Sequence, residues 1–96
     1  MALEASLERR CCTLARKRGI WAVKLMPSVA GLPDRLLLIP GGRVAFIEFK
    51  SPTGRVRPVQ ERVHGMLRSL GFTVEVIRHP AEFCFVLDRY WVPEKK

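Results

Sequence analysis

Apolar residues recur along the chain with two kinds of spacing, one typical of helices and one typical of strands. The changes between these spacings predict where each helix and strand lies. Residues 3–18 favour a helix because apolar side chains recur at helical spacing, at Leu3, Leu7, Cys11 and Leu14. Gly19 supplies a stop, and residues 20–25 are rich in aromatic and β-branched side chains, which indicates a strand. Residues 26–33 contain two prolines and a glycine and are predicted to form a loop.

Two apolar runs follow, and the segment between them predicts a β-hairpin. The runs are residues 34–39 and 43–50, separated by Pro40-Gly41-Gly42. Four consecutive apolar residues, 44–47, stand in the second run. We therefore expect both faces of this second strand to be buried and the strand to be central in its sheet.

The second half of the chain shows the same change from helical spacing to strand spacing. A helix is predicted from Pro58, which suits the first helical position, to Gly71, which ends it. Its apolar stripe consists of Val59, Val63, Met66, Leu67 and Leu70. Residues 72–77 alternate as a strand does, and residues 80–87 indicate a closing helix. The predicted fold class is α/β: an αβββαβ core with a terminal helix, its mixed sheet flanked by helices, in one domain of residues 1–96.

The formal net charge of +8 is spread along the chain and favours a polyanionic partner. We expect nucleic acid rather than an anionic membrane, because no lipidation signal is present. No apolar run reaches the ~20 residues of a membrane-spanning helix and no secretory signal is visible, so we expect an intracellular, cytoplasmic protein. The cysteines, Cys11, Cys12 and Cys84, form no disulfide or zinc pattern, which agrees with reduced thiols.

Charged residues at strand ends are the candidate chemistry. Glu48 and Lys50 close an otherwise apolar strand and, two residues apart, point to the same face. On spacing alone, a solvated ion pair worth at most about 1 kcal/mol is the simpler interpretation. A site is the alternative, and a third charged residue across the hairpin decides between them.

That residue is Asp34, whose position depends on the hairpin register. With a three-residue loop, Ile39 pairs with Arg43, and Asp34 falls opposite Glu48 with β-carbons about 4.5–5.5 Å apart. Two carboxylates so close repel each other unless a cation lies between them, and oxygen ligands favour Mg²⁺, Mn²⁺ or Ca²⁺. With a two-residue loop, Asp34 faces Phe49 instead and the two acids are only diagonal neighbours.

Lys50 then lies beside the predicted cation. A lysine there can orient the attacking water, help to deprotonate it, or stabilise charge on phosphate oxygens. Two acids, a cation and an amine together describe metal-assisted hydrolysis of a phosphodiester.

These residues resemble a known nuclease pattern. Gly31-Leu32-Pro33-Asp34, a hairpin, and Glu48-Phe49-Lys50 are similar to the PD-(D/E)xK motif. The run GLPDRLLLIPGGRVAFIEFKSPTGRVRPVQ, followed by Gly71-Phe72-Thr73-Val74, more narrowly resembles the VRR-NUC (virus-type replication-repair nuclease) family. The resemblance extends from Leu7 to about Ile77 and implies a restriction-endonuclease-like fold.

The resemblance also implies roles for individual residues. Asp34 and Glu48 become ligands of Mg²⁺ or Mn²⁺, joined by the backbone carbonyl of Phe49, and Lys50 becomes the catalytic lysine. Gln60 matches a glutamine that the family places near the site.

The first helix contributes a further acid in this resemblance. Glu8 aligns with the family's first-helix glutamate, a possible ligand of the same cation. Glu4, one turn away, is the alternative, although an acid there also suits the positive end of the helix dipole.

The basic side chains are candidate DNA contacts, of which the best are Arg9, Arg16, Lys24, Arg35, Arg55 and Arg57. The family often carries basic residues just before its Gly-x-Pro-Asp segment, where this chain has Ser28, Val29 and Ala30, so a phosphate contact there is not expected. His64 and His79 are interpreted as structural or exposed.

The predicted function is a divalent-metal-dependent DNA endonuclease acting on branched DNA such as Holliday junctions. The resemblance implies a homodimer and suggests a phage origin, with Trp21, Tyr90 or Trp91 as interface aromatics. Core packing is an equal alternative for Trp21. Two other functions stay open: a nickase or flap nuclease within a replication or repair assembly, and a non-catalytic nucleic-acid-binding protein on the same fold.

Overall fold

Helices and strands follow one another in the predicted order. The computed structural model describes residues 2–26 and 28–90. Its elements are α1 (Ala2–Lys17), β1 (Trp21–Lys24), β2 (Arg35–Ile39), β3 (Arg43–Phe49), α2 (Pro58–Ser69), β4 (Val74–Ile77) and α3 (Pro80–Arg89). Gly19 stands two residues after the end of α1 and has a φ of 73°, a conformation that glycine adopts without strain. The αβββαβ core with a terminal helix is therefore confirmed.

The four strands form one mixed sheet in the order β1-β2-β3-β4. The β1–β2 and β2–β3 pairs are antiparallel, and β3 pairs with β4 in parallel, so β3 is internal as predicted. In the hairpin, Ile39 pairs with Arg43 across a three-residue loop. Gly41 and Gly42 supply the positive φ angles of this loop, 91° and 75°. The register on which the site prediction depends is thus confirmed.

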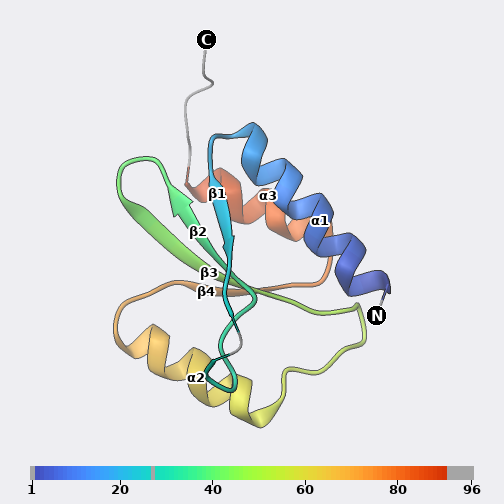
Figure 1. Ribbon diagram of the computed structural model, residues 1–96, viewed down its shortest axis with the longest axis vertical. Coiled ribbons are helices and arrows are strands. Elements are labelled where there is room, and N and C mark those ends of the chain that lie inside the picture. Colours follow the sequence, from blue (N-terminus) through green and yellow to red (C-terminus); the bar gives the residue numbers. More distant parts are fainter. Residues whose placement is uncertain (1, 27, 91–96) are drawn as a thin grey trace.

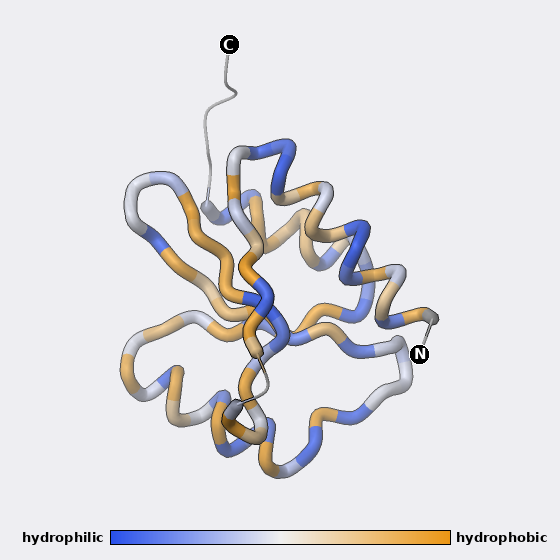
Figure 2. Tube along the Cα trace, viewed as in Figure 1, coloured by the Kyte–Doolittle hydropathy of each residue, from blue (hydrophilic) through white to orange (hydrophobic). Residues whose placement is uncertain are grey.

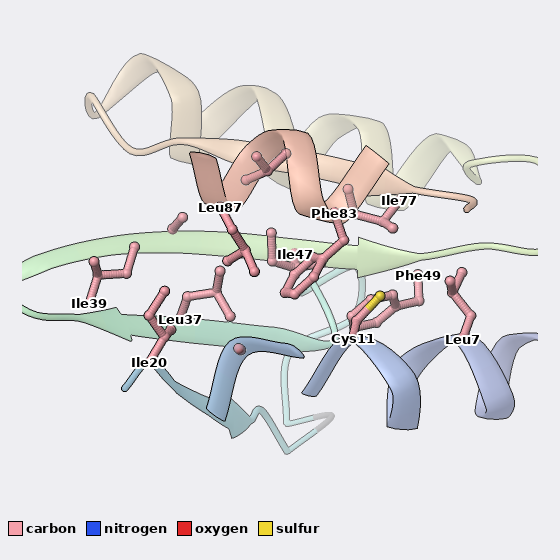
Figure 3. Packing of buried hydrophobic residues seen from close by; sticks show 13 residues of the cluster. Leu7, Cys11, Ile20, Leu37, Ile39, Ile47, Phe49, Ile77, Phe83 and Leu87 are labelled. Carbon is pink, nitrogen blue, oxygen red and sulfur yellow. The ribbon is translucent and has the colours of Figure 1, made fainter. Parts of the chain in front are cut away.

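Two helices close one face of this sheet. Figure 1 shows α1 and α3 together on one side, with α2 on the other. Alternate strand residues meet the two helices in a single cluster (Figure 3), which contains Leu7, Cys11, Ala15, Ile20, Leu37, Ile39, Ala45, Ile47, Phe49, Ile77, Phe83, Val86 and Leu87. These side chains are buried apolar groups, so this face holds the core.

The other face is only partly covered: α2 lies on this side, where it packs on β4 and its Gln60 reaches Glu48. Val44 and Phe46 are half-buried, so the prediction that both faces of β3 are buried is wrong for this face. The ring of Phe46 packs edge-on against Phe72, whose side chain is itself 40% exposed. The apolar stripe predicted for α2 is also incompletely buried, since Met66 is 55% exposed.

The aromatic candidates for an interface differ in their surroundings. Trp21 is 68% exposed, which excludes core packing for this residue. Tyr90 packs against the core and lies 5.7 Å from the guanidinium of Arg43. Trp91 lies outside the described residues. No helix in the described parts of the chain is long and apolar enough to span a bilayer.

Candidate active site

The hairpin brings two acids together at the edge of the core. Arg35, the first residue of β2, pairs with Ile47. Continuing this antiparallel register by one residue sets Asp34, just before β2, opposite Glu48. Asp34 is held there by a hydrogen bond that the Phe49 N–H donates to its Oδ2, at 2.7 Å. Figure 2 shows hydrophilic residues meeting where β1, the start of β2 and the end of β3 converge.

Glu48 is the most confined of the site residues. Its side chain is 3% exposed, although it carries a carboxylate. Oε2 accepts a hydrogen bond from Gln60 Nε2 at 3.1 Å and lies 3.8 Å from Lys50 Nζ. Oε1 has no hydrogen-bond partner, and its neighbour His64 Nε2 is 3.7 Å away. A buried carboxylate oxygen without a donor carries a desolvation penalty, so this position favours a positive group.

The raised pKa values of Asp34 and Glu48 also favour a positive group between these two acids. Burial, together with the charge of Asp34, raises the pKa of Glu48 to about 7. Burial also raises the pKa of Asp34, although the Phe49 N–H opposes this effect. A shared divalent cation would remove both penalties, and oxygen donors suit a hard cation such as Mg²⁺ or Mn²⁺. The residues present therefore fit the cation that the sequence predicts.

Helix α2 contributes two side chains to the Glu48 side of the site. Gln60 is 6% exposed, and its Oε1 accepts a hydrogen bond from the Arg57 N–H at 2.8 Å, which directs its amide nitrogen to Glu48. His64 is 2% exposed, and burial, with the charges of Arg68 and Lys50, lowers its pKa. Its contact with Glu48 was missed by the sequence analysis. The available signal was its spacing, since residues four apart share a helix face.

Glu8 occupies a different position from the two paired acids. Its carboxylate accepts hydrogen bonds from Arg35 Nε at 2.7 Å and Lys24 Nζ at 3.0 Å. Burial raises the pKa of Glu8, but these two bonds outweigh it and hold the pKa below its ordinary value. Within residues 2–26 and 28–90, no three His, Cys, Asp or Glu side chains are arranged so that they could hold one metal ion. The charge of Glu8 nevertheless raises the pKa of Asp34, so Glu8 lies near Asp34 as well as beside Lys24 and Arg35.

Close packing against α2 explains why a glycine stands at position 31 in the GLPD segment. Gly31 has a φ of 90°, and a β-carbon there would lie 2.5 Å from the carbonyl oxygen of Val59 in α2. The loop before Asp34 therefore presses directly on the helix that carries Gln60. Between them lies a hollow of about 250 Å³, whose lining includes Asp34, Arg57 and Gln60. Of the two paired acids, Asp34 lines this hollow.

The loop after Lys50 forms a basic surface. Arg55 and Arg57 are exposed, and they line a hollow of about 750 Å³ together with Arg78. Arg78 Nη1 donates hydrogen bonds to the carbonyl oxygens of Ser51 and Gly54 and so holds this loop in shape. The sequence analysis missed Arg78, because nothing in its local pattern indicates a partner 27 residues away.

The other predicted DNA contacts lie along α1 and β1. Arg9 and Arg16 are exposed and line a second hollow, of about 700 Å³. Lys24 is 57% exposed although it is bound to Glu8. Arg35 is more enclosed, because it bonds to Glu8 and to the carbonyl oxygen of Ala22.

Comparisons with known proteins identify the family. A family model described as "VRR-NUC domain" matches residues 5–80. "Putative nuclease p44" of Acyrthosiphon pisum secondary endosymbiont phage 1 is 39% identical over 75 residues, which cover 77% of this chain and 81% of the phage protein. A solved structure described as a VRR_NUC domain has a TM-score of 0.83 and 24% identity, and covers 92% of this chain and 97% of that chain. The chain therefore belongs to the VRR-NUC family, and it is a nuclease domain with the expected α/β fold.

Proposed function

We propose that this nuclease is a Mg²⁺- or Mn²⁺-dependent endodeoxyribonuclease. The observation that carries the proposal is the register that sets Asp34 opposite the buried Glu48, so that two carboxylates face each other and the charge of one raises the pKa of the other. Asp34, Glu48 and the backbone carbonyl of Phe49 would hold the cation. When bound, the cation polarises the phosphate and lowers the pKa of a coordinated water.

Lys50 is the proposed catalytic lysine. Its side chain is 12% exposed, and Nζ lies 3.8 Å from Glu48 Oε2, next to the paired acids. From this position the amine donates hydrogen bonds to the attacking water or to a phosphate oxygen. Gln60 holds Glu48 in place through its amide nitrogen. Glu8 acts on the substrate side by fixing Lys24 and Arg35, and the charge of Glu4 adds to the rise in the pKa of Glu48.

The substrate is DNA held mainly by its phosphates. The proposed contacts are the residues of the two basic hollows and of the Glu8 cluster: Arg9, Arg16, Lys24, Arg35, Arg55 and Arg57. Phosphate contacts do not read sequence, and no further element of the described chain offers a groove-reading helix, so shape is the expected basis of selection. Branched DNA such as a Holliday junction is the proposed substrate.

A homodimer suits a two-fold junction, and the half-open sheet face supports one. Trp21 pairs with Leu38 on this face, and Phe72 covers Phe46 beside it. Large exposed apolar side chains at Trp21, Met66, Leu70 and Phe72 offer a surface that a second copy would cover. We further propose that the protein acts in the cytoplasm, where its three thiols stay free.

Cleavage of a DNA panel tests the proposal. Four-way junctions, flaps, duplexes and single strands are incubated with EDTA, Mg²⁺ or Mn²⁺. The expected result is metal-dependent cutting of the junction above the other substrates, and its loss in Asp34→Asn. This variant keeps the size of the side chain and an oxygen that accepts from the Phe49 N–H.

Other results of the same assay would favour one of the two alternative functions. Preferential cutting of flaps or single nicks would favour the nickase or flap nuclease. Junction binding without cutting under any metal would favour the non-catalytic binding protein. Undiminished cleavage by Asp34→Asn would reject the proposed mechanism.

A further inference from the structure

Two buried polar atoms without hydrogen-bond partners face each other between β3 and α2. They are Glu48 Oε1 and His64 Nε2, 3.7 Å apart, on side chains that are 3% and 2% exposed. Leaving such a group unpaired destabilises the folded protein, because the loss of its contacts with water is not compensated. A chance arrangement of two orphaned atoms aimed at one another is therefore disfavoured, and the pair points to a specific interaction.

Helix geometry explains how one helix reaches both oxygens of Glu48. Gln60 and His64 are four residues apart in α2 and so lie one above the other on the same face. Gln60 Nε2 already donates to Oε2 at 3.1 Å. His64 Nε2 is the matching nitrogen for Oε1, one helical turn later.

The remaining gap is small. A charge-assisted N–H···O bond has a length of about 2.7–2.9 Å, so the observed separation is too long by roughly 1 Å. An ionised Glu48 attracts the imidazole N–H across this separation. A neutral imidazole carries one N–H, which is sufficient for this bond.

We propose that His64 is a positioning residue, whose Nε2–H donates to Glu48 Oε1 and fixes the plane of the carboxylate for cation binding. The inference rests on the proposed function, because it assigns Glu48 to the cation. It differs from a ligand role: His64 acts through Glu48 and does not touch the cation. Such outer hydrogen bonds tune cation affinity by orienting the ligand side chain.

Cation affinity of the full chain, without DNA, tests this assignment. His64→Gln keeps an N–H donor of similar reach, whereas His64→Met keeps bulk and removes the donor. We expect His64→Met to weaken Mn²⁺ binding, measured by calorimetry, by about 10–100-fold. His64→Gln should retain most of the affinity, and His79→Met, which changes the exposed second histidine, should retain all of it.

Three results would overturn the assignment. His64→Met could bind Mn²⁺ as tightly as the wild type, or His64→Gln could bind as weakly as His64→Met. An imidazole nitrogen coupling in the electron paramagnetic resonance spectrum of bound Mn²⁺ would show that His64 is a ligand. Thermal unfolding of each variant shows that the comparison is made between folded proteins.

A metal-free measurement separates this inference from the proposed function. In the ¹H–¹⁵N NMR spectrum of the wild-type protein in EDTA, we expect a protected proton on His64 Nε2 whose resonance shifts in Glu48→Gln. A proton on Nδ1 instead would refute the contact even if His64→Met fails to fold. If the proposed function is wrong, Asp34→Asn and Glu48→Gln bind Mn²⁺ as tightly as the wild type, whatever the His64 spectrum shows.

Discussion

Ile47 and Glu48 are neighbours on β3 and lie on opposite faces of one sheet. Ile47 is fully buried among apolar side chains from α1 and α3 (Figure 3), where every neighbour adds to stability. Glu48 is almost as buried, but it faces another acid and keeps one oxygen without a donor. One face of the sheet therefore supplies the stability of the fold, and the other holds an unfavourable arrangement of acids that suits a cation.

The largest expected effect is on catalysis, from a residue of the polar face. Lys50→Ala should lower junction cleavage by at least about 10²–10³-fold, because it removes a preorganised donor near the phosphate. The unfolding free energy should change little. Lys17→Ala, at an exposed position in α1, is the matched control and should cut normally. Cleavage rates at saturating Mg²⁺ check this, and equal rates for both variants would contradict the role of Lys50.

The next effect belongs to the apolar face. Ile47→Ala should destabilise the fold by about 2–5 kcal/mol, since it leaves a cavity between the two helices. Mn²⁺ affinity should be unchanged under conditions where the variant is folded. Urea unfolding measures the first quantity and calorimetry the second. If Ile47→Ala weakened Mn²⁺ binding in the folded protein, the two faces would not be separate in function.

A smaller effect of opposite sign is expected at Glu48. Its folded-state pKa, raised to about 7 by burial and Asp34, lies above its unfolded value. The folded state therefore holds the proton more tightly, and its unfolding free energy falls as the pH rises from about 4.5 to about 7.

Glu48→Gln has no titrating group at this position, so its unfolding free energy should not fall in this way between about pH 4.5 and about pH 7. In EDTA the variant should exceed the wild type in stability by about 1–3 kcal/mol at pH 7 and by less at pH 5. Saturating Mn²⁺ should then stabilise the wild type alone. Urea unfolding across this pH range provides the measurement. A wild type that is more stable than Glu48→Gln in EDTA would contradict the interpretation of Glu48 as an unfavourably buried acid.

Spacing within each element predicts the order of helices and strands and the opposition of Asp34 and Glu48. The Gly41-Gly42 loop sets the hairpin register, and that register alone pairs Asp34 with Glu48. The loop length and the strand register both depend on neighbouring residues in the sequence, so they can be predicted without the tertiary structure.

The features that were missed depend on how distant elements pack. Whether the Val44–Phe46 face is buried depends on how far α2 extends over it, which no periodicity encodes. His64 and Arg78 find partners on other elements, Glu48 and the carbonyl of Gly54. Glu8 as a ligand of the cation stays a prediction: its ion pairs with Lys24 and Arg35, and its charge effect on Asp34, follow from the packing of α1, which no local pattern encodes.

The smallest expected change in stability comes from the uncovered part of the polar face. Trp21 is 68% exposed, so Trp21→Ser should alter the unfolding free energy of the monomer by less than about 0.5 kcal/mol. Sedimentation should nevertheless show a weaker dimer, because the same side chain contributes to the proposed contact between copies. Phe85→Ser is the matched control, since Phe85 is an aromatic residue on α3 that is 67% exposed. Equal association of the wild type and Trp21→Ser would move the interface away from this face, and the half-open surface would then have no partner in the homodimer.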